Sequence, residues 1–204
     1  WEVGEYAPGL VQGWTLDAGM ASGDPATNVK FEVLMNNGNG RLSIGRRTGA
    51  AVQSAPAITK TFGNMTGKFV VEFDIIAPAS TTFNVRLEDS TKSGPTNMPI
   101  LLSVTGAAIS ITNNPDTTGT APIVQPPTAG KAYRIRLEVD TDTESLKVYV
   151  DGVAKINPLT ETKVFSFQRA TTTTWSGINR FFAGAASAGT SVVNIIVDNI
   201  KIYR

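Results

Sequence analysis

Apolar and polar side chains alternate with a period of two along much of the chain, which is the pattern of a half-buried β-strand. The clearest case lies between residues 131 and 152, where two alternating stretches (133–139 and 146–150) flank an Asp- and Thr-rich turn at 140–145. This arrangement predicts a β-hairpin. Because one face of the hairpin is apolar, we expect it to pack against a second layer of structure.

The same alternation predicts further short strands, separated by turns rich in Gly, Asn, Asp and Pro. They cover residues 29–35, 41–45, 57–62, 67–77, 81–89, 99–104, 107–112, 162–167, 178–183 and 192–204. We expect the strand at 81–89 to pair with the strand at 67–77, and the last strand to be bulged at Asp198 and Asn199. Residues 113–130 hold four prolines and are expected to form the longest loop.

These strands define the expected fold class. Turn signals recur roughly every 8 to 12 residues and no helical period of useful length is present, so the sequence predicts an all-β protein. A β-sandwich jelly roll of two antiparallel sheets suits the length of 204 residues. We expect one domain, residues 1–204, because β-sandwiches of this size are routinely single units.

Composition excludes several classes of function. The net charge is +1, so nothing favours attraction to nucleic acid or to an anionic membrane. The chain has no cysteine and no histidine, which excludes disulfides and thiol catalysis and removes the commonest general base and zinc ligand. No apolar run approaches the roughly 18 residues that would indicate a membrane span.

Three runs resemble the concanavalin A-like (laminin G-like) jelly rolls of bacterial polysaccharide-degrading proteins. They are GKFVVEFD at 67–74, AYRIRLEVD…LKVYVDG at 132–152, and IVDNIKI at 196–202. The opening EYAPGL…GW at 5–14 also resembles modules attached to secreted glycan lyases and hydrolases. The resemblance implies a concanavalin A-like fold, a secreted or cell-surface location, and a carbohydrate-binding module beside a catalytic domain of the parent chain.

One enzymatic alternative is a retaining glycoside hydrolase similar to family 16, whose strand motif is Glu-x-Asp-x-x-Glu. Glu72 and Asp74 match the first two positions, but Ala77 stands where the second glutamate belongs. Retention needs two carboxylates about 5 Å apart, so the acid/base is missing. Structural polarity across strands is the preferred interpretation of Glu72 and Asp74.

A second enzymatic alternative is a polysaccharide lyase, which neutralises a uronate and abstracts the proton α to it. Jelly-roll lyases commonly use arginine with a histidine or tyrosine base. Without histidine, the base would have to be a tyrosine. Tyr149 beside Arg134, Arg136 and Arg86 is the candidate set.

The polar faces of four strands form the candidate binding site. If the strands at 69–76, 83–88, 133–139 and 146–150 share a sheet, their polar side chains share one face. The candidates are Glu72, Arg86, Arg134, Arg136, Glu138 and Tyr149. The planar guanidinium suits carboxylates, so a concave face of this kind would hold a polysaccharide, including an acidic one. The alternative is cross-strand ion pairing on a solvated surface, which stabilises only weakly.

Trp175 is a further candidate for carbohydrate binding. It lies in a Thr-rich stretch, 170–177, where an exposed indole would offer a flat surface on which a sugar ring stacks. The alternative is that the ring tucks under the loop as part of a satellite core.

Asp198, together with an N-terminal carboxylate such as Glu5, resembles the places where related jelly rolls hold a structural calcium ion. Calcium takes about six to eight oxygen ligands, and the sequence offers only two or three candidates. The alternative is an Asp-Asn bulge in the last strand.

The sequence therefore favours a non-catalytic carbohydrate-binding module of a secreted, multidomain bacterial enzyme. The module would hold a polysaccharide on a concave sheet face or at its end loops. A lyase or hydrolase of the same fold, and a spacer or adhesion module without a glycan ligand, are the alternatives.

Overall fold

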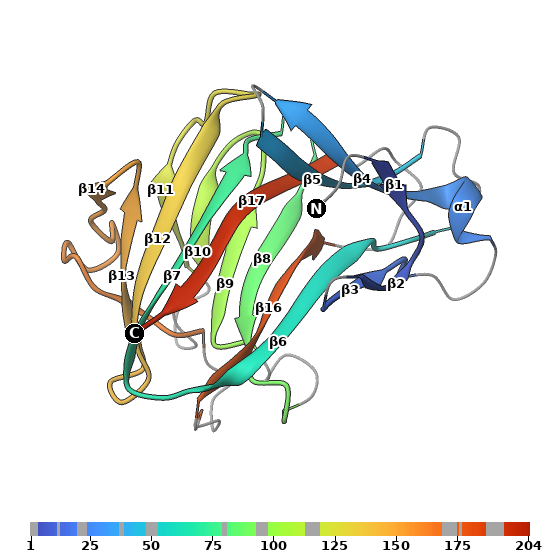
Figure 1. The fold of residues 1–204 in the computed structure, drawn as a ribbon. Coiled ribbons are helices and arrows are strands. Elements are labelled where there is room, and N and C mark those ends of the chain that lie inside the picture. Colours follow the sequence, from blue (N-terminus) through green and yellow to red (C-terminus); the bar gives the residue numbers. More distant parts are fainter. Residues whose placement is uncertain are drawn as a thin grey trace.

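Two antiparallel β-sheets lie face to face in this computed structural model (Figure 1). It describes residues 4–11, 13–19, 24–36, 39–47, 53–78, 81–92, 98–112, 119–168, 175, 177–186 and 194–204. Sheet A runs through β1 (Gly4–Tyr6), β4 (Val29–Asn36), β5 (Asn39–Arg46), β17 (Asn194–Tyr203), β7 (Lys68–Ile76), β12 (Ala132–Asp140), β13 (Ser145–Val150) and β14 (Val153–Ala154), and β15 (Phe165–Ser166) also pairs with β13. Sheet B runs through β11 (Thr120–Val124), β10 (Ile109–Thr112), β9 (Ile100–Val104), β8 (Phe83–Glu88), β16 (Ile178–Ala185), β6 (Ala57–Met65), β3 (Trp14–Asp17) and β2 (Gly9–Val11). The predicted all-β fold with two antiparallel sheets is confirmed.

Helical structure is minimal in the described part of the chain. It consists of the single turn α1 (Pro25–Asn28). None of the described helical structure is long and apolar enough to cross a membrane.

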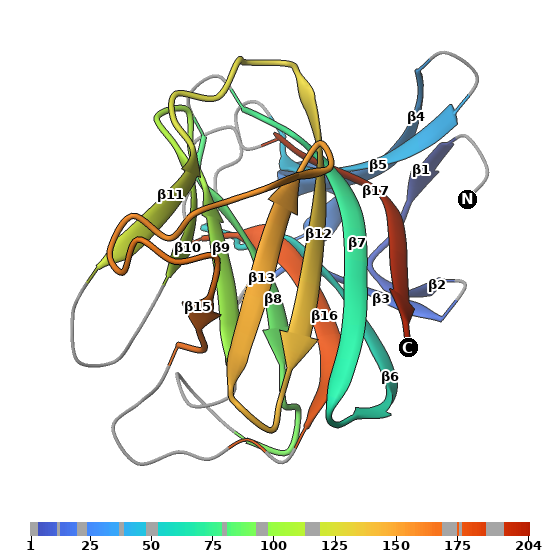
Figure 2. The same ribbon diagram turned by 90° about the vertical axis from the view of Figure 1, so that its left-hand side faces the viewer.

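The hairpin predicted at 131–152 is present as β12 and β13. Leu137 lies opposite Val148, and the two strands stay in register from Ile135 to Asp140. The turn is held by Asp140, whose side-chain oxygen accepts hydrogen bonds from two backbone N–H groups that follow it. The apolar face is buried, as the alternation predicts. In Figure 2 this hairpin and β7 face the viewer, with sheet B behind them.

The core lies between the inner faces of the two sheets. Alternate residues of β7 point into it, and Phe73 and Ile75 are completely buried. Phe73 meets Phe181 of β16 edge to face, with ring centroids 5.6 Å apart. This geometry is favoured between aromatic rings because the positive edge of one ring faces the negative face of the other. The contact joins the central strand of one sheet to a central strand of the other.

Three sequence predictions about strands are wrong. β8 does not pair with β7, because it lies in sheet B between β9 and β16. The predicted loop at 113–130 contains strand β11, which pairs with β10. The strand expected at 162–167 is only the two-residue β15. Period-two alternation identifies the buried face of a strand but does not identify its neighbours.

The bulge predicted at Asp198 and Asn199 is present and opens one side of the sandwich. The register of β17 against β7 shifts there, and Asn199 has a φ of 51°, which Asn tolerates better than most residues. Before the bulge β17 pairs with β5, whereas residues 200–203 pair on that side with no described strand. β6 likewise loses β3 after Thr59. The two free edges, 200–203 of β17 and 60–65 of β6, border the opening.

We predict that Phe73→Ala lowers the free energy of unfolding by about 3–5 kcal/mol, because it removes a fully buried ring and leaves a cavity between the sheets. Chemical denaturation monitored by circular dichroism measures the loss. Val153→Ala is the control, since Val153 is 61% exposed and its substitution should change stability by less than about 0.5 kcal/mol. Equal effects of the two substitutions would contradict the placement of Phe73 at the centre of the core.

Candidate functional site

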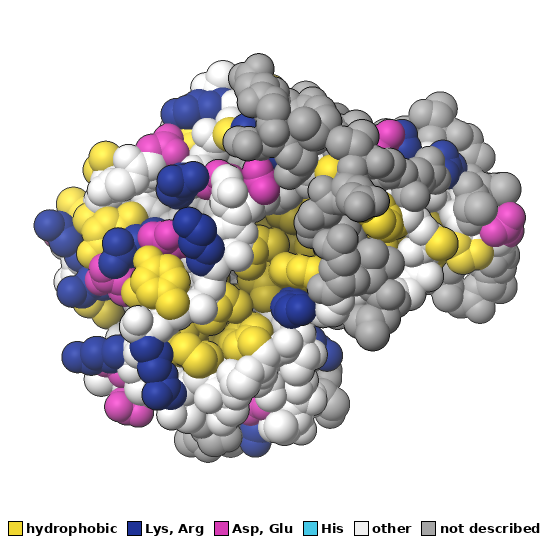
Figure 3. Space-filling view, in the orientation of Figure 1, with side chains coloured by type: hydrophobic (Ala, Val, Ile, Leu, Met, Phe, Trp, Pro, Cys, Tyr) yellow, Lys and Arg dark blue, Asp and Glu magenta, His cyan; other side chains and the backbone are white. Residues whose placement is uncertain are grey.

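Five predicted site residues share the outer face of sheet A. Glu72 of β7 lies opposite Arg136 of β12, and Arg136 lies opposite Tyr149 of β13. Arg134 and Glu138 flank Arg136 on the same strand face. Figure 3 shows charged side chains of both signs gathered over this part of the molecule.

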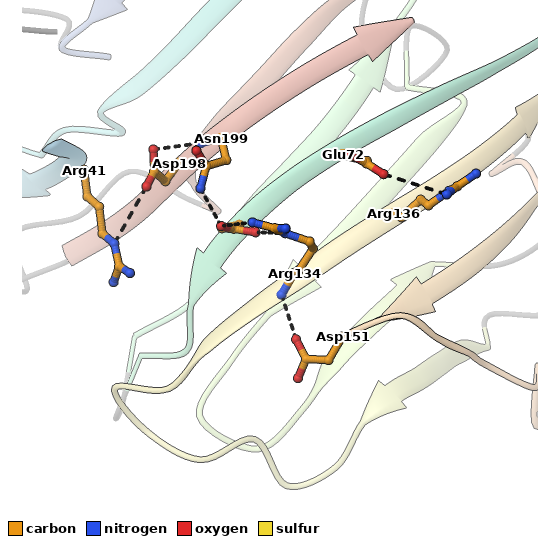
Figure 4. A network of polar contacts seen from close by, with 8 residues as sticks. Arg41, Glu72, Arg134, Arg136, Asp151, Asp198 and Asn199 are labelled. Atoms are coloured by element: carbon orange, nitrogen blue, oxygen red, sulfur yellow. Dashed lines mark hydrogen bonds and ion pairs between the residues drawn. The ribbon is translucent and has the colours of Figure 1, made fainter. Parts of the chain in front are cut away.

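Each arginine of this face is paired with a carboxylate (Figure 4). Arg134 forms two hydrogen bonds to the carboxylate of Asp74, of 2.9 and 3.2 Å. Arg136 donates to Glu138 at 3.0 Å and lies 3.9 Å from a carboxylate oxygen of Glu72. The side chain of Arg134 is 61% exposed. The contacts therefore match the cross-strand ion pairing that the sequence left as the alternative to a binding site.

Asp74 is the centre of a second set of contacts on this face. Besides Arg134, the side-chain amide of Asn199 donates to it at 2.7 Å. Burial raises the pKa of the Asp74 carboxyl, but the hydrogen bonds from Arg134 and Asn199, and the charges of Arg134 and Arg41, outweigh burial. The pKa of Asp74 therefore lies below its usual value. These contacts tie the bulge of β17 to β7 and β12.

The tyrosine-based lyase arrangement is not assembled. The Tyr149 hydroxyl donates to Glu138 at 3.2 Å. Desolvation raises the pKa of Tyr149, and so do its hydrogen bond to Glu138 and the negative charge of Glu138. A general base instead needs a pKa close to the working pH. Arg86 lies in the other sheet, so it cannot share a face with Tyr149.

Arg86 belongs instead to the outer face of sheet B. It projects from β8 opposite Phe182 of β16, and its guanidinium carbon lies 4.3 Å from the centroid of that ring. Glu88, two residues further along β8, lies opposite Arg180. We call the outer face around Arg86, Glu88, Arg180 and Phe182 the recess, because its polar side chains are largely covered. Glu88 is 2% exposed and the Arg86 side chain 22%.

The recess carries more positive than negative charge. Arg180 Nε donates to one carboxylate oxygen of Glu88 at 2.5 Å. Nη1 of Arg86 lies 3.8 Å from the other oxygen. Burial lowers the pKa of the Arg86 guanidinium although Glu88 raises it. Its Nε is buried and has no hydrogen-bond partner among the described residues. Two cations thus share one carboxylate, and one buried donor is unused.

Small and polar residues lie near the two arginines, although the direct cross-strand neighbours of Arg86 are Phe182 and Leu101. Asn84 lies two residues before Arg86 on the same strand face, opposite Gly184 of β16 and Ser103 of β9. Thr61 of β6 lies opposite Arg180. Hydroxyl and amide groups at these positions can donate and accept hydrogen bonds, and Gly184 has no side chain to cover its neighbours.

Trp175 is 4% exposed, so the prediction that it stacks on a sugar is wrong. Its ring meets that of Phe167 edge to face, with centroids 6.2 Å apart. The second interpretation of the sequence, a satellite core under the loop, is the one that the structure shows.

The two predicted calcium ligands do not lie together. Glu5 in β1 aligns with Glu32 of β4, then with Ser43 of β5 and Ile196 of β17. Three strand spacings, roughly 14 Å in all, thus separate the backbone of Glu5 from the strand that carries Asp198. The described residues contain no group of three Asp, Glu, His or Cys suited to a metal ion.

Sequence reasoning missed Glu88, Arg180 and Phe182. The predicted strand at 81–89 contained Glu88, but pairing it with β7 placed Arg86 in the wrong sheet. In β16 the adjacent apolar residues Phe181 and Phe182 obscure the alternation, and the register shifts between Ile178 and Arg180. The alternate spacing of Arg86 and Glu88 was the one signal available.

No protein-family model and no curated protein sequence matches the chain. Solved structures do match it. A sialidase superposes with a TM-score of 0.64 at 13% identity over 93% of this chain, which spans only 17% of the sialidase. An alginate lyase of polysaccharide lyase family 7 gives 0.59 at 11% identity, over 93% of both chains. The carbohydrate-binding module CBM66 from Bacillus subtilis gives 0.50 at 12% identity, over 94% of this chain and 96% of the module.

These likenesses establish the class of fold. The protein is a concanavalin A-like jelly-roll β-sandwich, as the sequence resemblance implies. The fold is shared by carbohydrate-binding modules and by carbohydrate-active enzymes. Which of these roles applies to this chain depends on its own side chains.

We predict that Asp74→Asn lowers the free energy of unfolding by about 1 kcal/mol at pH 7, because it weakens charge-assisted hydrogen bonds to a partly exposed arginine. The folded-state pKa of Asp74 lies below the unfolded value of about 3.9. The difference in free energy of unfolding between the wild type and the variant should therefore be largest at higher pH. This difference should disappear as the pH falls through the folded-state pKa. Urea denaturation from pH 7 to pH 3 measures the difference. Asp142→Asn, in the exposed turn, is the control, and a gap that does not narrow between pH 5 and pH 3 would contradict the assignment.

Calcium binding stays a prediction, and chelation tests it. Asp198 accepts a hydrogen bond from the backbone N–H of Asn199 and lies 3.8 Å from Nε of Arg41. If calcium binds at Asp198, EDTA should lower the melting temperature, whereas an unchanged melting temperature would show that Arg41 and not calcium balances this carboxylate. A fall in the melting temperature that added calcium reverses, and that Asp198→Asn abolishes, would restore the calcium site.

Proposed function

We propose that this protein is a non-catalytic carbohydrate-binding module that holds an acidic polysaccharide in the recess of sheet B. The observation that carries the proposal is the unbalanced pair of arginines. Arg86 and Arg180 share the single carboxylate of Glu88, and Nε of Arg86 is buried without a partner among the described residues. A carboxylate from a ligand would supply the missing negative charge and the missing acceptor.

The surroundings of Arg86 suit a uronate residue. Its guanidinium lies over the ring of Phe182, which restricts its movement and so lowers the entropy lost on binding. Partial desolvation strengthens its attraction for a carboxylate. The hydroxyl and amide groups of Thr61, Asn84 and Ser103 lie on the same sheet face. They would satisfy the hydroxyl groups of the sugar.

The same contacts favour holding a glycan over cleaving it. Glu88 is the one carboxylate among the named residues of the recess, and both arginines contact it, whereas glycoside hydrolysis needs a pair of carboxylates. The chain contains no histidine, and Tyr149 lies on the other sheet. The likenesses to CBM66 and to the alginate lyase both concern the fold, so the choice between binding and cleaving rests on these side chains.

The proposed biological role follows from binding without catalysis. A secreted or cell-surface parent enzyme would use the module to keep its catalytic domain close to the polysaccharide. Once the module has bound the polysaccharide, the encounter of the catalytic domain with the same polysaccharide becomes intramolecular. The effective concentration of substrate at the catalytic domain therefore rises.

We predict that the protein is retarded in affinity gels that contain an acidic polysaccharide, such as alginate or polygalacturonate, and passes unretarded through gels with a neutral glucan. Arg86→Ala should weaken retardation by about tenfold or more, the usual effect of losing a hydrogen-bonded charge partner. Arg134→Ala is the matched control on sheet A and should change retardation less than twofold.

Three results would overturn the proposal. They are no retardation by any acidic polysaccharide, equal losses in the Arg86 and Arg134 variants, and formation of unsaturated uronate products, detected by ultraviolet absorbance. The last result would identify a lyase. Circular dichroism of both variants shows whether each has kept the fold.

A further inference from the structure

The opening between the sheets contains a cavity of about 320 Å³ that the proposed function does not use. Its lining residues are Trp14, Leu42, Ile58, Val197, Asp198, Asn199 and Ile200. They come from both sheets, at the place where the bulge of β17 separates this strand from β5. Figure 3 shows apolar side chains lining a hollow in the middle of this face. The recess lies on the opposite side of sheet B.

Lys60 is a cation near Trp14, at the edge of this cavity. Lys60 of β6 lies opposite the inward-pointing Phe181, so its side chain starts from the inner face of sheet B. Its ammonium nitrogen lies 5.9 Å from the centroid of the Trp14 ring. Lys60 forms no ion pair with any described carboxylate. Among the described residues its charge therefore faces an aromatic ring and no carboxylate, and a ligand carboxylate would add the opposite charge.

Trp14 adds a hydrogen-bond donor to the cavity. The indole N–H of Trp14 donates to no described residue, although the ring is held edge to face against Phe181. Asp198 and Asn199 also border the cavity, but their side chains contact Arg41 and Asp74 on the outer face of sheet A.

From these groups we infer a second binding site, for a single acidic sugar residue. This inference rests on the proposed function, since it assumes that the protein meets acidic glycans. The flat indole of Trp14 suits the apolar face of a pyranose ring, and Lys60 suits its carboxylate. Ligand pockets usually have volumes of roughly 300–1,000 Å³. This cavity lies at the lower end of that range, so it fits one sugar ring and not an extended polysaccharide. The site would therefore take the end of a chain or a free monosaccharide.

Trp14 provides a direct readout of binding. The chain has three tryptophans, so a nitrogen-15 correlation spectrum contains up to three indole N–H signals, and Trp14→Phe identifies the one from Trp14. We predict that methyl β-glucuronide shifts this signal in a saturable way. Methyl β-glucoside, which differs in lacking the carboxylate, should bind about tenfold more weakly or worse.

The variants separate this site from the recess. Lys60→Gln should weaken the response to glucuronide about tenfold or more, whereas Lys163→Gln, at an exposed position, and Arg86→Ala should leave it unchanged. In affinity gels Lys60→Gln should keep the retardation that Arg86→Ala loses. The two proposals therefore fail independently of each other.

Any of three outcomes would overturn the inference. They are no shift of the Trp14 signal at any glucuronide concentration, equal responses to glucuronide and glucoside, and an unchanged response in Lys60→Gln. Lys60 would then act as an inward-pointing charge that keeps the open strand edges from pairing with other chains.

Discussion

The packing of β7 against β16 is the contact on which the rest of the structure depends. Phe73 and Phe181 meet at the centre of the sandwich. Because side chains alternate along a strand, burying these two rings turns Glu72 and Asp74 outward on one sheet, and Arg180 and Phe182 outward on the other. Both charged faces are therefore consequences of one apolar contact. A one-residue slip of either strand would exchange its core and surface side chains.

The two outer faces use the same chemistry under different solvent exposure. On the outer face of sheet A, Arg134 and Arg136 each have a carboxylate partner, and Arg134 is mostly exposed. Exposed pairs of this kind contribute little free energy. In the recess of sheet B, Glu88 is almost completely covered and serves two arginines. An incompletely paired cation is costly in free energy where water is scarce. A ligand carboxylate would therefore stabilise Arg86 more than Arg134. Burial, not the number of arginines, distinguishes a candidate site from a charged surface.

Alternation in the sequence was sufficient to predict the β12–β13 hairpin, the buried face of β7 and the bulge at Asp198. It was not sufficient to assign β8 to a sheet, because a strand with one apolar face can pack in either layer. Arg86 was therefore grouped with the arginines of β12. Trp175 shows a related limit, since a tryptophan among threonines has the same sequence signature whether its ring is exposed or packed against Phe167. Residues brought together by sheet topology, such as Glu88 and Arg180, can be recognised only after strand order is known.

The bulge at Asp198 and Asn199 links the fold to the cavity. If β17 continued in register, β5 would remain beside it and cover the inner face of sheet B near Trp14. After the shift β17 has no described neighbour on that side, and β6 likewise extends beyond its pairing with β3. Free edges and uncovered apolar side chains promote aggregation unless they are covered or charged. Asn199 is held in its left-handed conformation by its bond to Asp74, so the ion pairs of sheet A also stabilise this opening. The contacts on the outer face of sheet A therefore also hold the bulge in shape.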